Sequence, residues 1–203
     1  MIKHFIWDMG NVLLLFDPHQ AVRDVLGERP DLPAIVQATT MAPEWKKLDQ
    51  GIISEEDAIQ AMVHRLPSLE QEIRFFMKHW DTCLQPVPHM LELVGKVQRA
   101  GYSLHLLSNA GVRFHRYCAR FPVFDLMDTI HISADMKLIK PDPAIYQKLL
   151  QELGLIPEEC LFIDDLEENI QGAQSVGIPG HVFLSQDELY HYLITQHILE
   201  ESV

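Results

Sequence analysis

The decisive stretch reads Phe5-Ile6-Trp7-Asp8-Met9-Gly10-Asn11-Val12-Leu13, a short apolar run that ends in a carboxylate and a turn. Aromatic and β-branched residues favour a buried strand, and Gly10-Asn11 favours a tight turn directly after it. A carboxylate is seldom buried without a partner. The position of Asp8 therefore predicts a side chain placed for chemistry, although a plain hairpin turn would use the same residues.

Similar apolar runs recur along the chain and alternate with segments of helical periodicity. The expected strands are residues 4–7, 102–107, 129–132, 160–163 and 181–184. The expected helices of the second half are residues 86–100, 143–153 and 167–176, each followed by a glycine. This alternation is typical of a parallel sheet covered by helices, so the predicted fold class is α/β with a Rossmann-like core.

Residues 16–85 differ from the rest of the chain. They show helix-period patterns and loop signals without a convincing strand, and Ser54 precedes three acids as a helix N-cap does. Trp45 and Trp80 are interpreted as packing residues of this segment. We therefore predict a helical cap at residues 16–85, inserted into a core made of residues 1–15 and 86–203.

The composition limits the classes of function. With 47% apolar residues in 203, the chain can bury a substantial core. Its 29 acidic residues against 16 basic ones give a net charge of −13, which opposes binding to nucleic acid. Its apolar runs fall short of the roughly 20 residues that span a bilayer, and its three scattered cysteines fit a reducing compartment. We expect a cytoplasmic monomer or homodimer that binds neither membranes nor nucleic acid.

Polar side chains follow four of the expected strands. The carboxyl ends of parallel strands meet in one crevice, so these side chains are expected to lie together. A cation, a hydroxyl and several carboxylates in one place suit a small phosphorylated metabolite held by a divalent metal. The residues concerned are Asp8, Ser108, Asn109, Lys140, Asp164 and Asp165.

Each of these groups has a chemical role in phosphoryl transfer. A carboxylate such as Asp8 can attack phosphorus and form an acyl phosphate. Asp8 and Asp165 could share Mg²⁺, which prefers oxygen ligands, with Asp164 as a further candidate ligand. Lys140 would offset the negative charge of the transition state.

Ser108 and Asn109 are the candidate phosphate-binding residues. Their side chains could donate hydrogen bonds to phosphate oxygens, as could Lys140. Free backbone N–H groups at the start of a helix that is expected to begin near Gly111 would assist them.

Four short motifs follow one another in a fixed order along nearly the whole chain. They resemble the motifs of the haloacid dehalogenase superfamily, in its branch with a small helical cap and sugar-phosphatase-like members. The resemblance implies a Rossmann-like core, a mobile cap and Mg²⁺-dependent phosphatase activity on small phosphate esters, such as sugar phosphates. Lys140 matches the third motif better than Lys137 because it directly precedes Pro141. The motifs are Asp8-Met9-Gly10-Asn11-Val12, Ser108-Asn109, Lys140-Pro141-Asp142-Pro143-Ala144-Ile145-Tyr146 and Asp164 to Ala173.

One departure from the family pattern lies at Gly10. Phosphatases that this chain resembles commonly carry an aspartate there, which protonates the leaving alcohol and later activates water. Losing such a group costs on the order of 10²- to 10⁴-fold in rate unless another group replaces it. The backbone carbonyl of Gly10 is still a candidate metal ligand, since that contact needs no side chain. Asp17 is a weak candidate for the replacement acid, and substrate or water is another.

Two other functions stay open. A hydrolytic 2-haloacid dehalogenase of the same superfamily also lacks the second acid and needs no metal, but it tends to carry Ser or Asn in place of Asp164-Asp165. A non-enzymatic binding or regulatory protein could keep the fold, yet Asp8, Lys140 and Asp165 together argue against a lost activity. In either enzyme, selectivity is expected to come from cap side chains folded over the crevice.

Overall fold

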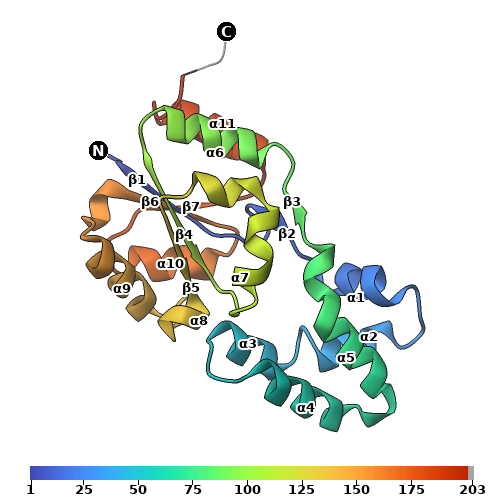
Figure 1. Cartoon of the computed structure of the whole chain (residues 1–203). Coiled ribbons are helices and arrows are strands. Elements are labelled where there is room, and N and C mark those ends of the chain that lie inside the picture. The colour runs from blue at the N-terminus through green and yellow to red at the C-terminus, as the bar shows by residue number, and fades with distance from the viewer. Residues whose placement is uncertain (201–203) are drawn as a thin grey trace.

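A five-stranded parallel sheet forms the centre of the computed structural model, which describes residues 1–200 (Figure 1). Its strand order is β5-β4-β1-β6-β7, so the first strand lies in the middle and the chain crosses to either side of it. The bounds are β1 His4–Trp7, β4 Ser103–Ser108, β5 Thr129–Ile132, β6 Cys160–Asp164 and β7 Gly180–Val182. The predicted parallel α/β sheet is confirmed, and the strand order brings the ends of β1, β4 and β6 to one edge.

Helices cover both faces of the sheet because its central strands are apolar on both sides. Phe5 and Trp7 of β1 belong to one buried cluster with residues of α6 and α11, whereas Ile6 belongs to another with residues of α9 and α10. Figure 1 shows these two pairs of helices on opposite faces of the sheet. The bounds are α6 Met90–Arg99, α7 Phe114–Tyr117, α8 Ser133–Met136, α9 Pro143–Leu153, α10 Glu167–Gln174 and α11 Gln186–Thr195. Within residues 1–200, no helix combines the length and the apolar character needed to cross a membrane.

Five helices lie between β2 and β3 and are called the insertion here. They share a buried cluster of their own, to which Ile35, Met62 and Phe76 contribute. Ser54 accepts a hydrogen bond from the Asp57 N–H at 3.1 Å, which confirms it as the N-cap of α4. The domain boundaries at residues 15/16 and 85/86 stay a prediction. The helices are α1 Pro18–Leu26, α2 Leu32–Ala38, α3 Pro43–Asp49, α4 Glu55–Arg65 and α5 Glu70–His79.

A two-stranded antiparallel sheet joins the two ends of the insertion, and the sequence did not reveal it. Leu14 of β2 (Leu14–Leu15) pairs with Pro86 of β3 (Gln85–Pro86), and Leu15 pairs with Gln85. Strands of two residues are too short for a period-two pattern, and proline disfavours strand assignment. The pair makes the chain leave and re-enter the core side by side, next to the turn that follows Asp8.

Candidate active site

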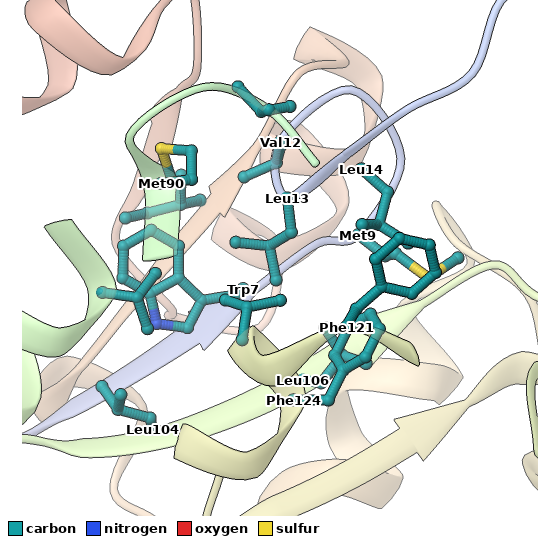
Figure 2. Close-up of a cluster of buried hydrophobic side chains, with 14 of the residues drawn as sticks. Trp7, Met9, Val12, Leu13, Leu14, Met90, Leu104, Leu106, Phe121 and Phe124 are labelled. Atoms are coloured by element: carbon teal, nitrogen blue, oxygen red, sulfur yellow. The ribbon is translucent and has the colours of Figure 1, made fainter. Parts of the chain in front are cut away.

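Asp8 lies directly after β1 and is held by buried structure on both sides. Its backbone N–H donates to the carbonyl of Ile163 in β6 at 2.9 Å, which extends the ladder by one residue. The turn that follows is anchored by its apolar side chains: Figure 2 shows Met9, Val12 and Leu13 in the same cluster as Trp7. Because strand and turn are both fixed, the Asp8 carboxylate has a defined place, and Asp8 is only 7% exposed.

Lys140 brings a buried positive charge to Asp8. Its Nζ donates to Asp8 Oδ1 at 2.8 Å and to Asp164 Oδ2 at 2.6 Å, and the residue is 3% exposed. Burial alone would lower the pKa of Lys140, but the attraction of Asp8 and Asp164 outweighs it and raises the pKa. The ammonium therefore stays charged and fixes both carboxylates.

Asp164 is fully buried, and protein donors occupy its two oxygens. Besides Lys140, the side chain of Asn169 donates to Oδ1 at 2.9 Å and to Oδ2 at 3.0 Å. The backbone N–H of Leu166 donates to Oδ1 at 2.9 Å. Asp164 thus positions Lys140 and the loop after β6. Asp165 accepts fewer hydrogen bonds from the protein than Asp164 and is the freer of the two carboxylates.

The carboxylates of this edge form a group of oxygens that suits a divalent cation. One ligand atom from each of Asp8, Asp164 and Asp165 lies within 4.8 Å of the others. Burial raises the pKa of Asp8 to about 6, with Lys140 opposing this and Asp164 adding to it. Burial and the charge of Asp164 also raise the pKa of Asp165. Three carboxylates against one ammonium leave negative charge in excess, and a hard dication with oxygen ligands would compensate it.

Asn11 connects the turn after Asp8 to this acidic group. It adopts a left-handed backbone conformation with φ 52°, which asparagine tolerates better than most residues. Its Nδ2 lies 3.4 Å from Asp165 Oδ2, and its Oδ1 accepts from the Phe16 N–H at 3.1 Å. The Gly-Asn pair of the first motif therefore shapes the turn and links it to the fourth motif.

Ser108 and Asn109 lie at the carboxyl end of β4, as expected, and both line the same cavity as Asp8. The Asn109 amide, however, brackets the Lys140 backbone: Oδ1 accepts from its N–H at 2.9 Å and Nδ2 donates to its carbonyl at 3.0 Å. The helix expected near Gly111 was placed too early, because a turn delays α7 until Phe114. Phosphate binding by these residues stays a prediction and rests on Ser108 more than on a helix N-terminus.

A cavity of about 260 Å³ separates this edge of the sheet from the insertion. Trp45 and Trp80 pack against the buried cluster of the insertion, as predicted, and they also line this cavity. Their rings lie 5.0 Å apart, both line the cavity, and Phe16 stacks on Trp45 with ring centroids 5.8 Å apart. Leu84 adds to the same wall. The insertion therefore presents an aromatic and aliphatic surface to whatever occupies the cavity.

The acid of the insertion that lines the cavity is not the one expected from the sequence. Asp17, the candidate replacement acid, accepts from the Gln20 N–H at 2.6 Å as the N-cap of α1 and does not line this cavity. Asp49, which no motif singled out, does line it. The only sequence signal for Asp49 is an acid two residues before Gly51, a loop glycine with φ 67°, and such a pair is common at helix ends.

A family model described as haloacid dehalogenase-like hydrolase matches residues 2–177. The chain belongs to this family. Sesquiterpene phosphatase astK of Aspergillus oryzae is 28% identical to this haloacid dehalogenase-like hydrolase over 179 residues, which cover 88% of each chain.

Solved structures share the fold of this haloacid dehalogenase-like hydrolase. A HAD family enzyme of Bacteroides thetaiotaomicron, in complex with magnesium and inorganic phosphate, superimposes with a TM-score of 0.76 at 22% identity, covering 95% of this chain and 99% of that one. L-2-haloacid dehalogenase of Xanthobacter autotrophicus, with chloropropionic acid covalently bound, gives 0.67 at 20% identity, covering 98% and 84%. The fold is thus shared with an enzyme that binds magnesium and phosphate and with a dehalogenase. The choice between these two kinds of function has to rest on the residues of the site.

Proposed function

We propose that this hydrolase is a Mg²⁺-dependent phosphatase that transfers the phosphoryl group of a small ester to Asp8. The observation that carries the proposal is the group of three carboxylates at this edge: the buried Asp8 and Asp164, both paired with Lys140, and the half-buried Asp165 beside them. A dehalogenase substrate is a carboxylate with a neutral carbon centre and gains nothing from two further acids. The phosphatase relative and the magnesium and phosphate in the neighbouring structure support the same choice.

Asp8 is proposed as the nucleophile because its carboxylate is fixed and faces the cavity. Its oxygen attacks phosphorus, and the ester oxygen leaves from the opposite side. Lys140 holds the attacking carboxylate in place and offsets charge on the phosphoryl oxygens, and Ser108 donates a hydrogen bond to one of these. Water then cleaves the aspartyl phosphate and frees Asp8 for the next turnover.

Asp8, Asp165 and the Gly10 carbonyl are proposed to hold Mg²⁺, with Asp164 behind them aligning Lys140. When bound, the ion would offset charge on the phosphoryl oxygens and on the nucleophile. The residues fit such an ion because they offer only oxygen donors and carry excess negative charge. Domain boundaries at 15/16 and 85/86, with residues 16–85 as a cap, belong to the same proposal.

The organic part of the ester is proposed to lie against Phe16, Trp45, Trp80 and Leu84. A sugar phosphate was the substrate suggested by the family resemblance, and its ring could stack on the indole rings. This wall has no hydroxyl or amide side chain to pair with sugar hydroxyl groups, so an aryl or branched alkyl phosphate suits it better. The sesquiterpene phosphatase relative points in the same direction.

Phosphate release from esters of both kinds tests the proposal. We expect hydrolysis of p-nitrophenyl phosphate, with larger kcat/KM for aryl and branched alkyl phosphates than for hexose phosphates. EDTA and Asp8→Asn should each abolish it. Turnover that survives both, or chloride release from a 2-chloro acid without metal, would refute the proposed chemistry. Preference for hexose phosphates would refute only the substrate class.

A further inference from the structure

Asp49 is an acid of the insertion that lies on the cavity, and the roles described above give it no task. It is the last residue of α3, and its carboxylate faces the backbone N–H of Gly111. A Cβ placed on Gly111 would be 3.8 Å from Asp49 Oδ1. Gly111 follows Ser108 by three residues, so the carboxyl group lies against the loop that carries the candidate phosphate ligand.

Contacts with the core hold the backbone around Asp49 in this position. Ser133 Oγ donates to the Asp49 carbonyl and accepts from the Ala110 N–H at 2.9 Å. Two residues further on, Lys137 Nζ donates to the Gly51 carbonyl at 2.5 Å. A Cβ on Gly51 would lie 2.3 Å from the Ala134 carbonyl oxygen, so the loop is seated directly on α8. These contacts between the core and the α3 loop therefore fix the position of the Asp49 carboxyl group on the cavity.

The core supplies no acid beside the nucleophile at position 10. Gly10 has no side chain, and a Cβ there would have Asp8 Oδ2 as its nearest neighbour, at 4.0 Å. Among the described residues that line the cavity, the carboxylates are Asp8, Asp165 and Asp49. The first two belong to the metal-binding group of the proposed function, which leaves Asp49 as the carboxyl group available for proton transfer.

The surroundings of Asp49 favour its protonated form. Burial raises the pKa of Asp49 to about 8, and the N–H of Gly111 opposes this by stabilising the carboxylate. A general acid works best when its pKa lies near the working pH. The titratable or charged groups that face Asp49 across its cavity and the adjoining hollows are Asp8, Lys46, Glu55, Arg113, Arg116, Tyr117, Lys140, Asp165 and Glu168.

We propose that Asp49 is the proton donor and acceptor of this enzyme, in place of the acid missing at Gly10. The inference rests on the proposed phosphatase function. As Asp8 bonds to phosphorus, the bond from phosphorus to the ester oxygen breaks, its electron pair stays on that oxygen, and the Asp49 proton moves to it. The products of this step are the alcohol, the aspartyl phosphate and the Asp49 carboxylate.

In the second step the Asp49 carboxylate acts as a base. It takes a proton from water while the water oxygen bonds to phosphorus, and the bond between phosphorus and Asp8 breaks with its electron pair returning to Asp8. Inorganic phosphate leaves, Asp49 is protonated again, and both side chains are restored. One water is consumed for each ester, as hydrolysis requires.

The leaving group of the ester separates this role from a structural one. Hexanol leaves poorly without a proton, whereas p-nitrophenol leaves well without one. We expect Asp49→Asn to lower kcat for hexyl phosphate by about 10²- to 10⁴-fold. With p-nitrophenyl phosphate, the first turnover should stay within a few-fold of the wild-type rate and later turnovers should slow, because water has lost its base. This gives a burst of p-nitrophenol and an accumulated phosphoenzyme.

Three further variants make the test decisive. Gly10→Asp in the Asp49→Asn background should restore hexyl phosphate hydrolysis, since the space beside Asp8 Oδ2 is open. Asp187→Asn, an exposed acid of α11, is the matched control and should change nothing. Loss of alkyl phosphatase activity in Asp17→Asn with full activity in Asp49→Asn would overturn the inference in favour of Asp17.

The pH profile gives an independent readout. Wild-type kcat for hexyl phosphate should fall above about pH 8 as Asp49 ionises, and the rate of Asp49→Asn should lack this decline. Equal losses on both esters in the first turnover, or an undiminished rate on hexyl phosphate, overturn the inference. Failure of the proposed function looks different, because the wild type would then release no phosphate from either ester.

Discussion

Asp49→Asn should stabilise the folded protein by an amount that grows as the pH rises. The pKa of Asp49 is raised from 3.8 to about 8 because the folded chain buries its carboxyl group. Below pH 4 the group is protonated in both the folded and the unfolded state. Between pH 4 and 8 the unfolded chain ionises first, so rising pH favours unfolding of the wild type until the folded group has ionised too. An asparagine at this position does not ionise, so its free energy of unfolding lacks this dependence on pH.

The size of the effect follows from the shift. One pKa unit corresponds to about 1.4 kcal/mol, so a shift from 3.8 to about 8 sets a limit of about 6 kcal/mol at pH 9. Asp49 is only partly buried, so solvent screens part of this effect. We therefore expect the difference in the free energy of unfolding between variant and wild type to grow by about 1–3 kcal/mol from pH 5 to pH 9.

Urea unfolding followed by circular dichroism measures this difference. Urea titrations of the wild type and of Asp49→Asn are carried out at pH 5, 7 and 9. EDTA is present throughout, so that metal binding does not contribute to the free energy of unfolding. Asp187→Asn, whose acid is exposed, should give a difference independent of pH. A difference for Asp49→Asn that stays constant from pH 5 to 9, or that shrinks, would refute the reasoning about its burial.

Two further substitutions probe the buried charges and the seat of the insertion. Lys140→Met should cost about 3–5 kcal/mol of unfolding free energy at pH 7, because Asp8 and Asp164 lose their cation. The loss should be smaller at pH 5, because burial raises the pKa of Asp8 to about 6 and its protonation removes one of the two charges. Equal losses at both pH values in urea would contradict this. Gly51→Ala should loosen the insertion, because the added Cβ would meet the Ala134 carbonyl and the φ of Gly51 is 67°. We expect a higher KM and faster cleavage of the insertion by protease. An unchanged KM and cleavage rate would count against the contact between Gly51 and Ala134.

The sequence predicted those elements whose pattern is local. Residues 4–7 and 143–153 form β1 and α9 with the expected bounds, because an apolar run with a turn, and a Pro-to-Gly helix, each carry their own signals. The convergence of Asp8, Lys140 and Asp165 followed from the rule that the ends of parallel strands meet. Such features depend on neighbours in sequence or on a general property of sheets.

Other features depend on how the insertion lies against the core, and no local pattern encodes that. Asp49 and Trp45 line the cavity because α3 lies against the loop that follows β4. Asp17 lies outside the cavity because its carboxylate caps α1. The Asn109 amide pairs with the backbone of Lys140, a contact that no sequence pattern indicated. Each of these outcomes is set by a tertiary contact between distant segments.

The bonds from Ser133 and Lys137 to the α3 loop have a consequence for how the enzyme could evolve. The proposed nucleophile Asp8 follows β1 of the core, whereas the proposed acid Asp49 lies on the insertion, so the two side chains face one cavity only while these contacts hold. Exchanging the insertion for that of a relative would transplant substrate choice and proton transfer together. Recombinants would need either an acid equivalent to Asp49 or an aspartate restored at Gly10.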